Sequence, residues 1–200
     1  RPALRVLMLG CFVSISVNTA LLGVLEPLGS AFAVDGPMLA QTYLVVNCTA
    51  SLVTGWLCNG NRISSTITFT VGLMGISVAF LLLTLSVLLA HHAGLGTLAS
   101  LLLVAGCWLS GIFSGELACS RAVFVKEHFP SQVSGRIYGI AEIIVAFGSF
   151  LFIALFGPEG DDYESFARPI LASASCSIVA LVAIVPDLKL VQPWLPATPA

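Results

Sequence analysis

Glu142 is the residue with the clearest potential for chemistry, because it is an acid inside a long apolar run, 135–157. A carboxylate in such a place costs roughly a few kcal/mol unless it is paired, protonated or hydrated. One interpretation is functional: Glu142 carries a proton that is coupled to another event, or it binds the ammonium group of a substrate. The other is structural, with Glu142 as the partner of a nearby cation or hydroxyl. The sequence leaves both open.

Polar side chains also recur at helical spacing within two other apolar runs. They are Ser14 and Asn18 in the run 6–28, and Tyr43, Asn47, Ser51 and Thr54 in the run 38–58. Residues three or four apart lie on one face of a helix, so each set predicts a polar stripe. Such stripes either join helices through hydrogen bonds or line a path for a polar solute. Trp108 is interpreted in the same two ways, as a packing residue or as a contact in that path.

Enzymatic chemistry finds no support in the sequence. The segment 111–115, with Ser114, is similar to that of intramembrane serine proteases. Serine catalysis needs a base such as histidine within hydrogen-bonding distance. No apolar run contains a histidine, and His128 lies in a predicted loop. The six cysteines form neither a CxxC nor a Cys/His pattern, which is typical of small buried hydrophobic residues. We expect no enzyme activity, no cofactor and no metal site.

Composition identifies the elements that position these residues. Hydrophobic residues make up 58% of the chain and charged residues only 9%, whereas a soluble domain carries about 25% charged residues. Six apolar runs are each long enough to cross a hydrocarbon layer of about 30 Å as a helix. These runs are 6–28, 38–58, 65–90, 95–118, 135–157 and 167–186. The sequence predicts an all-α membrane protein with six transmembrane helices in residues 1–186, followed by a proline-rich cytoplasmic tail, 187–200.

The distribution of cations predicts the orientation of these helices. With a cytoplasmic N-terminus, the outer loops contain only one cation, Arg168. The cytoplasmic segments contain the others: Arg1, Arg5, Arg62, Arg121, Lys126, Arg136 and Lys189. Positive residues concentrate on the cytoplasmic side of membrane proteins. We therefore expect both termini in the cytoplasm, and we favour the plasma membrane over an organelle membrane.

Small residues and one further acid predict contacts between the helices. The segments 111–115 and 135–139 each carry a GxxxG pattern, which allows two membrane helices to approach closely. Glu116 lies near the cytoplasmic end of its run. We expect it to form a structural ion pair with one of three nearby cations, Arg121, Arg62 or Arg136.

Two predicted cytoplasmic segments resemble signatures of the major facilitator superfamily. The segment 55–62 (GWLCNGNR) resembles a loop in which a glycine is followed four residues later by an acid and then by basic residues. The segment 121–139 (RAVFVKEHFPSQVSGRIYG) is similar to the stretch that leads into the next-to-last helix. Asn59 stands where an acid is usual, and Arg62 is displaced from the usual basic positions. These departures predict a weaker loop contact.

The resemblance implies the C-terminal six-helix half of a twelve-helix transporter, with the N-terminal half as its partner. Such proteins move a solute by alternating access to a site near the middle of the membrane. The resemblance implies a solute pathway that includes Ser14, Asn18, Tyr43, Asn47, Trp108 and Glu142. It also implies a cytoplasmic gating loop made of Gly55, Asn59, Arg62 and Arg136, in which the second helix meets the start of the fifth.

The segments 55–62 and 129–130 are also similar to facilitators of large neutral amino acids, so we expect a small solute such as an amino acid. Two alternatives stay open at this point. The chain could be a subunit of a six-helix channel or pore, or a membrane scaffold that transports nothing. The chain opens Arg1-Pro2 without a methionine, and we therefore expect it to be a fragment.

Overall fold

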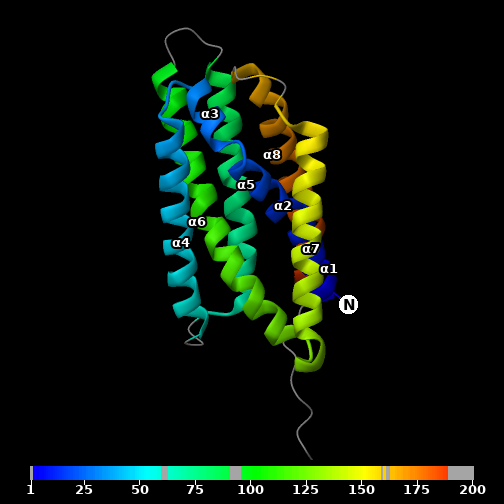
Figure 1. The fold of residues 1–200 in the computed structure, drawn as a ribbon. Coiled ribbons are helices and arrows are strands. Elements are labelled where there is room, and N and C mark those ends of the chain that lie inside the picture. The colour runs from blue at the N-terminus through cyan, green and yellow to red at the C-terminus, as the bar shows by residue number, and fades with distance from the viewer. Residues whose placement is uncertain (1, 60–62, 91–95, 159, 161–162, 189–200) are drawn as a thin grey trace, which may run out of the picture.

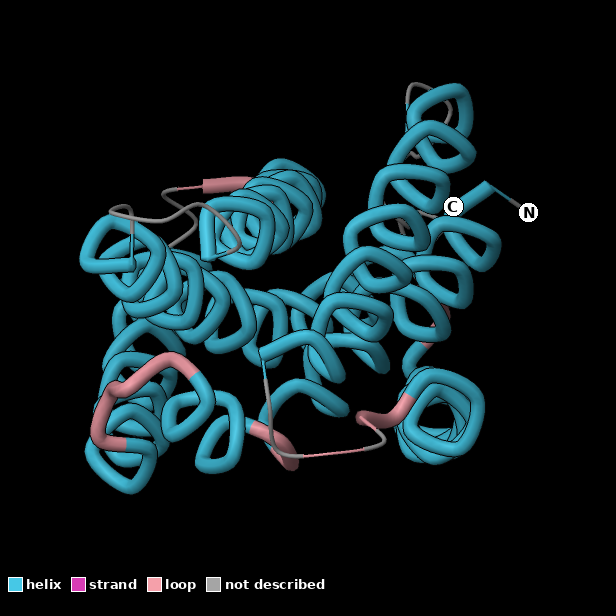
Figure 2. Tube along the Cα trace, turned by 90° about the horizontal axis from the view of Figure 1, so that it is seen from above, coloured by secondary structure: helices cyan, strands magenta, loops and turns pink. Residues whose placement is uncertain are grey.

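The chain folds as a bundle of helices (Figure 1), which are seen nearly along their axes in the view from above (Figure 2). The computed structural model describes residues 2–59, 63–90, 96–158, 160 and 163–188, and all regular elements in those ranges are helical. The elements are α1 (Pro2–Leu9), the π-helix η1 (Gly10–Ile15), α2 (Ser16–Leu22), α3 (Leu25–Ala31), α4 (Gly36–Asn59), α5 (Ser65–Ala90), α6 (Gly96–His128), α7 (Ser131–Phe156) and α8 (Tyr163–Leu188). The prediction of an all-α protein is confirmed.

Five of these helical segments are long and apolar enough to cross a membrane. They are Pro2–Leu22, Ser65–Ala90, Gly96–His128, Ser131–Phe156 and Glu164–Asp187. The chain is therefore a helical multi-pass membrane protein. The sixth predicted crossing, α4, has the length at 24 residues. Its hydropathy is lower, because polar residues such as Gln41 and Asn47 interrupt its apolar sequence. We number the six long segments in chain order: segment 1 is α1–η1–α2, and segments 2 to 6 are α4 to α8.

The largest differences from the predicted boundaries occur at two of the runs. The run 6–28 is not one helix, because helical backbone stops after Leu22 and Val24 adopts φ −119° and ψ 7°. A separate short helix, α3, then carries Pro27 in its first turn, where the missing N–H of proline needs no partner. The run 95–118 extends to His128, because no glycine or proline interrupts the chain between Glu116 and Pro130. Arg121, which we expected in a loop, consequently lies on α6.

The five most extensive contacts among the six segments follow a repeating pattern. Segment 4 packs against segments 2 and 3, segment 1 packs against segments 5 and 6, and segments 3 and 6 pack against each other. Exchanging segments 1, 2 and 3 with segments 4, 5 and 6 leaves this set of pairs unchanged. The exchanged segments run in opposite directions through the bundle (Figure 1). The fold therefore contains two three-helix units that are inverted relative to each other.

Glycines on α5 and α6 bring the central helices together. A Cβ on Gly72 would lie 2.7 Å from Leu117, and one on Gly75 would overlap the ring of Phe113, so neither position has room for a side chain. Between the same helices, Phe69 and Phe124 stack with ring centroids 5.2 Å apart. Without a hydrophobic driving force in lipid, such close contacts supply much of the attraction between helices.

The two helices at opposite sides of Figure 1, α4 and α7, carry large apolar side chains that the bundle leaves uncovered. Leu52 on α4 is 77% exposed, and Phe150 on α7 is 71% exposed. In a membrane protein these outer faces contact lipid or another helical bundle.

Candidate functional site

A hydrogen-bonded group at the centre of the bundle joins segments 1, 2 and 4. Asn18 is buried, and its amide Nδ2 donates to the hydroxyl of Tyr43 at 2.9 Å. The hydroxyl of Ser110, on α6, donates to the amide oxygen of Asn18. Both ends of the Asn18 amide are therefore used, as expected for a polar side chain within a membrane domain. We call Asn18, Tyr43 and Ser110 the central polar cluster.

The π-helix η1 lies directly before this cluster on segment 1. A π turn holds more residues than an α turn and is frequently found at functional sites. The hydroxyl of Ser16 donates to the carbonyl oxygen of Cys11 at 2.9 Å, which gives that carbonyl a side-chain partner at the widened turn. Ser14, predicted to share a stripe with Asn18, is buried within η1.

The polar stripe on α4 faces α6 over much of its length. A Cβ on Gly115 would overlap the main-chain oxygen of Asn47, and the hydroxyl of Ser51 donates to the main-chain oxygen of Gly115 at 3.0 Å. Thr54, one turn further along, is also buried. The stripe therefore joins two helices, which was one of the two interpretations that the sequence left open. Asn47 contributes its backbone to this contact, and its side chain is half-buried.

Trp108 borders the same helix pair on the outside. Its indole Nε1 donates to the hydroxyl of Thr42 at 3.2 Å, and the residue is 45% exposed. One edge of the indole is thus held by α4, while the rest of the ring is free to contact lipid or a solute.

An ion pair links α6 to α7. Nη2 of Arg121 lies 2.6 Å from Oε1 of Glu142, and the guanidinium lies 5.5 Å from the centre of the Tyr138 ring. The two partners differ in burial, because the Arg121 side chain is 7% exposed and that of Glu142 is 42% exposed. Glu142 thus has the cationic partner that its structural interpretation required, and it also has an open face. We call Arg121 and Glu142 the charge pair.

Glu116 does not take part in this pair. The expected ion pair of Glu116 with Arg121 is wrong, because Arg121 turns to α7 and binds Glu142. The ion pairs within the described ranges are Arg121–Glu142 and Arg5–Asp187, the second at 3.4 Å. Arg62, another expected partner, lies outside the described residues.

The predicted gating loop is only partly described. Gly55 lies against α6, where a Cβ would be 3.1 Å from the sulfur of Cys119. Arg62 and the side chain of Asn59 lie outside the described residues. Arg136 is exposed near the start of α7. Because α4 and α7 stand at opposite sides of the bundle (Figure 1), the structure does not bring Gly55 to Arg136 within this chain.

The two GxxxG patterns have different surroundings. Gly111 and Gly115 contact α4, so their predicted role in helix packing is confirmed. Gly135 and Gly139 have open space where a Cβ would be, and no other helix of the described chain approaches them there.

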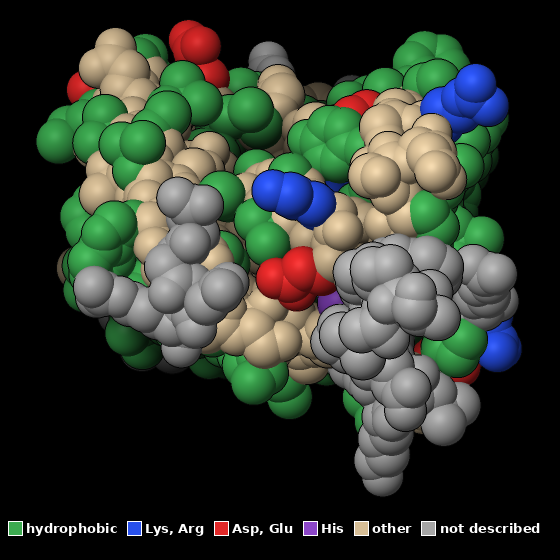
Figure 3. All heavy atoms as spheres, turned by 90° about the horizontal axis from the view of Figure 1, so that it is seen from below, with side chains coloured by type: hydrophobic (Ala, Val, Ile, Leu, Met, Phe, Trp, Pro, Cys, Tyr) green, Lys and Arg blue, Asp and Glu red, His purple; other side chains and the backbone are tan. Residues whose placement is uncertain are grey.

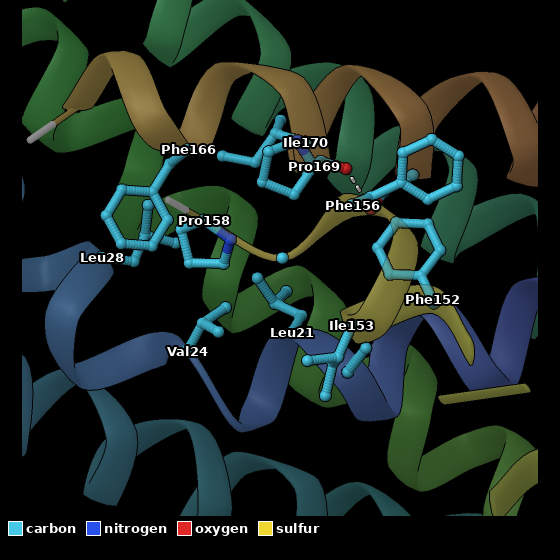
Figure 4. A pocket seen from close by; sticks show the side chains of 13 residues that line it. Leu21, Val24, Leu28, Phe152, Ile153, Phe156, Pro158, Phe166, Pro169 and Ile170 are labelled. Carbon is cyan, nitrogen blue, oxygen red and sulfur yellow. Dashed lines mark hydrogen bonds between the residues drawn. The ribbon is translucent and has the colours of Figure 1, made fainter. Parts of the chain in front are cut away.

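An apolar pocket lies among α2, α3, α7 and α8, away from the charge pair (Figure 4). Phe152, Phe156, Phe166 and Leu21 are among the residues that line it. Ser173 also lines the pocket, and its hydroxyl donates to the main-chain oxygen of Pro169 at 2.6 Å. The pocket therefore offers shape and apolar surface, and no charged side chain, to a ligand.

Sequence reasoning missed Ser110 and the pairing of Arg121. Ser110 and Ser114 are four residues apart, and this helical spacing was a signal that could have marked Ser110. Arg121 was counted as a loop cation, although the uninterrupted helical sequence from Glu116 to His128 was a signal that it lies on α6.

In comparisons with known proteins, no protein-family model matches the chain, and no curated protein matches its sequence. A proposal of function therefore rests on the fold and the contacts described above.

Replacing Tyr43 with phenylalanine tests the central polar cluster. We expect Tyr43→Phe to lower the free energy of unfolding by about 1 kcal/mol, because the Asn18 amide loses its acceptor. Thermal unfolding in detergent, followed by tryptophan fluorescence, measures the change. A double-mutant cycle with Ser110→Ala should show coupling through Asn18. Strictly additive losses would mean that the three side chains act independently.

Proposed function

We propose that this chain is one six-helix half of a transporter of the major facilitator type, and that it moves a small solute by alternating access. The inverted pair of three-helix units carries this proposal. Nested inverted repeats of three helices are a feature of each half of such transporters, and the two halves rock about a site near the middle of the membrane.

A detail of the helix contacts supports the repeat. Ser51 on segment 2 donates its hydroxyl to a main-chain oxygen of segment 4, at Gly115. Ser149 on segment 5 donates to a main-chain oxygen of segment 1, at Ser16, at 3.0 Å. The exchange of the two units converts one contact into the other. A glycine next to each contact, Gly115 in one and Gly148 in the other, allows the backbones to approach.

The distribution of polar groups fits a solute path along segments 1 and 4. These two segments carry Asn18, Ser110 and Arg121, which are all buried. Segments 2 and 5 complete the two polar groups through Tyr43 and Glu142. Buried polar and ionisable groups in a membrane domain mark solute and ion pathways in many transporters.

The uncovered faces of α4 and α7 are where we place the partner half. The open glycines Gly135 and Gly139 allow a second bundle to approach α7 closely. The exposed apolar side chains of α4, Leu52 among them, give the same partner a surface to pack against.

We further propose a cytoplasmic location for the end of the bundle at which α6 ends and α7 begins. Arg5, Lys126 and Arg136 lie at this end, whereas Arg168 lies near the start of α8. The view from below shows cationic and anionic side chains and a histidine on this face (Figure 3). The cation distribution supports this orientation, and we propose the plasma membrane rather than an organelle membrane.

Counterflow in proteoliposomes tests the proposal. The complete gene product is reconstituted with an excess of an unlabelled solute inside, and uptake of the same labelled solute is followed. We expect saturable, transient accumulation of an amino acid such as leucine, because a carrier exchanges solute across a single alternating site. Protein-free vesicles are the control.

The same assay separates the competing functions. Flux that rises linearly with solute concentration would indicate a pore. Vesicles that exchange none of a broad solute panel, although the protein is folded, would indicate a scaffold.

A further inference from the structure

The charge pair contains a cation whose hydrogen-bonding capacity is not used. Arg121 is buried, yet two of its three side-chain nitrogens, Nε and Nη1, have no hydrogen-bond partner. Among the charged side chains that the structure describes, this is the one with buried nitrogens left unsatisfied. A buried N–H without a partner costs about 1–3 kcal/mol, and more in a charged group. Such a group is expected to receive a partner during function.

The guanidinium geometry defines what this partner is. Arginine presents five N–H donors in a planar fork and has no acceptor, so its natural ligand is a carboxylate or another oxyanion. Nη2 already binds Oε1 of Glu142. The N–H groups on Nε and Nη1 remain for an oxyanion that comes from elsewhere.

The surroundings of the pair do not supply that oxyanion. The groups that face Arg121 are Glu142 and Tyr138 from α7 and the Cys11 thiol from segment 1. Tyr138 brings both its ring and its hydroxyl close to the guanidinium, and the Cys11 thiol is a weak acceptor; neither group is an oxyanion. Glu142 is the one carboxylate among them, and it is engaged through a single oxygen.

Charge balance then restricts the class of solute. Arg121 and Glu142 together carry no net charge, so a simple anion bound to Arg121 would leave one uncompensated negative charge inside the membrane domain. Such a charge is costly there. A zwitterion places its carboxylate at Arg121 and its ammonium at Glu142, and the site stays neutral. Glu142 can receive the ammonium because its side chain is 42% exposed.

We propose that the charge pair is a binding site for a zwitterionic solute, with Arg121 binding the carboxylate and Glu142 binding the ammonium group. The inference rests on the proposed transport function and assigns the substrate class to named residues. In the empty site the two side chains neutralise each other. The solute adds its carboxylate at the unsatisfied N–H groups of Arg121 and its ammonium group at the exposed side of the Glu142 carboxylate.

Competition among three compounds with the same isobutyl side chain tests the site. Leucine carries both charges, 4-methylpentanoate carries only the carboxylate, and 3-methylbutylamine carries only the ammonium. Each is added outside proteoliposomes that contain the complete gene product and catalyse leucine counterflow. We expect leucine to compete at concentrations at least tenfold lower than either singly charged compound.

Arg121→Lys separates recognition from structure. Lysine keeps the positive charge and can still pair with Glu142, but it lacks the planar fork. We expect at least a tenfold rise in the half-inhibitory concentration of leucine, while 3-methylbutylamine is unaffected. Glu142→Gln should reverse the preference, so that 4-methylpentanoate competes better than leucine. Arg5→Gln breaks the other ion pair, Arg5–Asp187, and serves as the matched control with unchanged values.

If the half-inhibitory concentration of leucine is unchanged in folded Arg121→Lys protein, the proposed binding site is wrong. If Glu142→Gln does not fold, the lysine variant alone decides. Counterflow of an uncharged solute, without binding of leucine, would also overturn the site and leave the transport proposal intact. A third outcome separates the two proposals. If leucine raises the melting temperature of the native protein but not of Arg121→Lys, and the vesicles show no flux, the binding site is supported and the transport proposal is contradicted.

Discussion

Replacing Gly115 with alanine is expected to destabilise the protein by about 3 kcal/mol, because overpacking a close helix contact displaces backbone rather than a flexible side chain. The added Cβ would overlap the main-chain oxygen of Asn47 on α4. It would also disturb the hydrogen bond from Ser51 to Gly115. Unfolding of the purified protein in mixed micelles of increasing SDS content measures the loss of free energy.

Gly96→Ala is the matched control for this substitution. Gly96 lies at the start of the same helix, α6, and open space surrounds the position of its Cβ. Alanine has the higher helix propensity. We expect the free energy of unfolding to change by less than about 0.5 kcal/mol. Equal losses at the two positions would contradict the assignment of the α4–α6 contact to Gly115.

Removing Glu142 is expected to be more damaging than removing Arg121. Glu142→Leu leaves a buried cation without a counter-charge, which costs about 3 kcal/mol. Arg121→Leu leaves the more exposed partner, a carboxylate whose side chain is 42% exposed, and the expected cost is about 1 kcal/mol. Unfolding free energies of the two variants, measured at the same pH and salt concentration, give the comparison.

The Arg5–Asp187 pair provides the reference for an accessible ion pair. Arg5 is 65% exposed, so Arg5→Leu should cost less than about 1 kcal/mol. A larger loss for Arg121→Leu than for Glu142→Leu would show that the acid is the more deeply buried partner. That result would remove the basis for an accessible Glu142.

Hydropathy predicted the helical architecture well, because a span of about 20 apolar residues has few alternatives to a helix in lipid. Hydropathy predicted the helix boundaries less well where an apolar sequence becomes more polar but the backbone stays helical. The apolar run ends near 118, but α6 continues to His128, since its amphipathic end packs against α5 and stays helical. The opposite happens at Gly23 and Val24, where an apolar sequence turns and a new helix starts.

Helical spacing predicted the stripe on α4, and it could not choose between the two roles of that stripe. Serine and glycine contacts depend on which helix lies opposite, and a single sequence does not contain that information. The same limit applies to Glu142. Its need for a cation was predictable from the cost of burial. The identity of Arg121 as that cation depends on the approach of α6 to α7. Sequence favoured Arg121 as a partner for Glu116, which lies on the same helix.

The π-helix η1 makes the orientation of segment 1 depend on the number of residues in its widened turn. One residue turns an α-helix by about 100°, so the widened turn between Gly10 and Ile15 sets the angle at which everything after it faces the bundle. Asn18 lies beyond this turn, and Cys11, beside Arg121, lies within it. A segment that can exchange a π turn for an α turn would swivel its outer part against its inner part while keeping its backbone hydrogen-bonded. The central polar cluster thus lies beyond the widened turn, and the charge pair lies beside it.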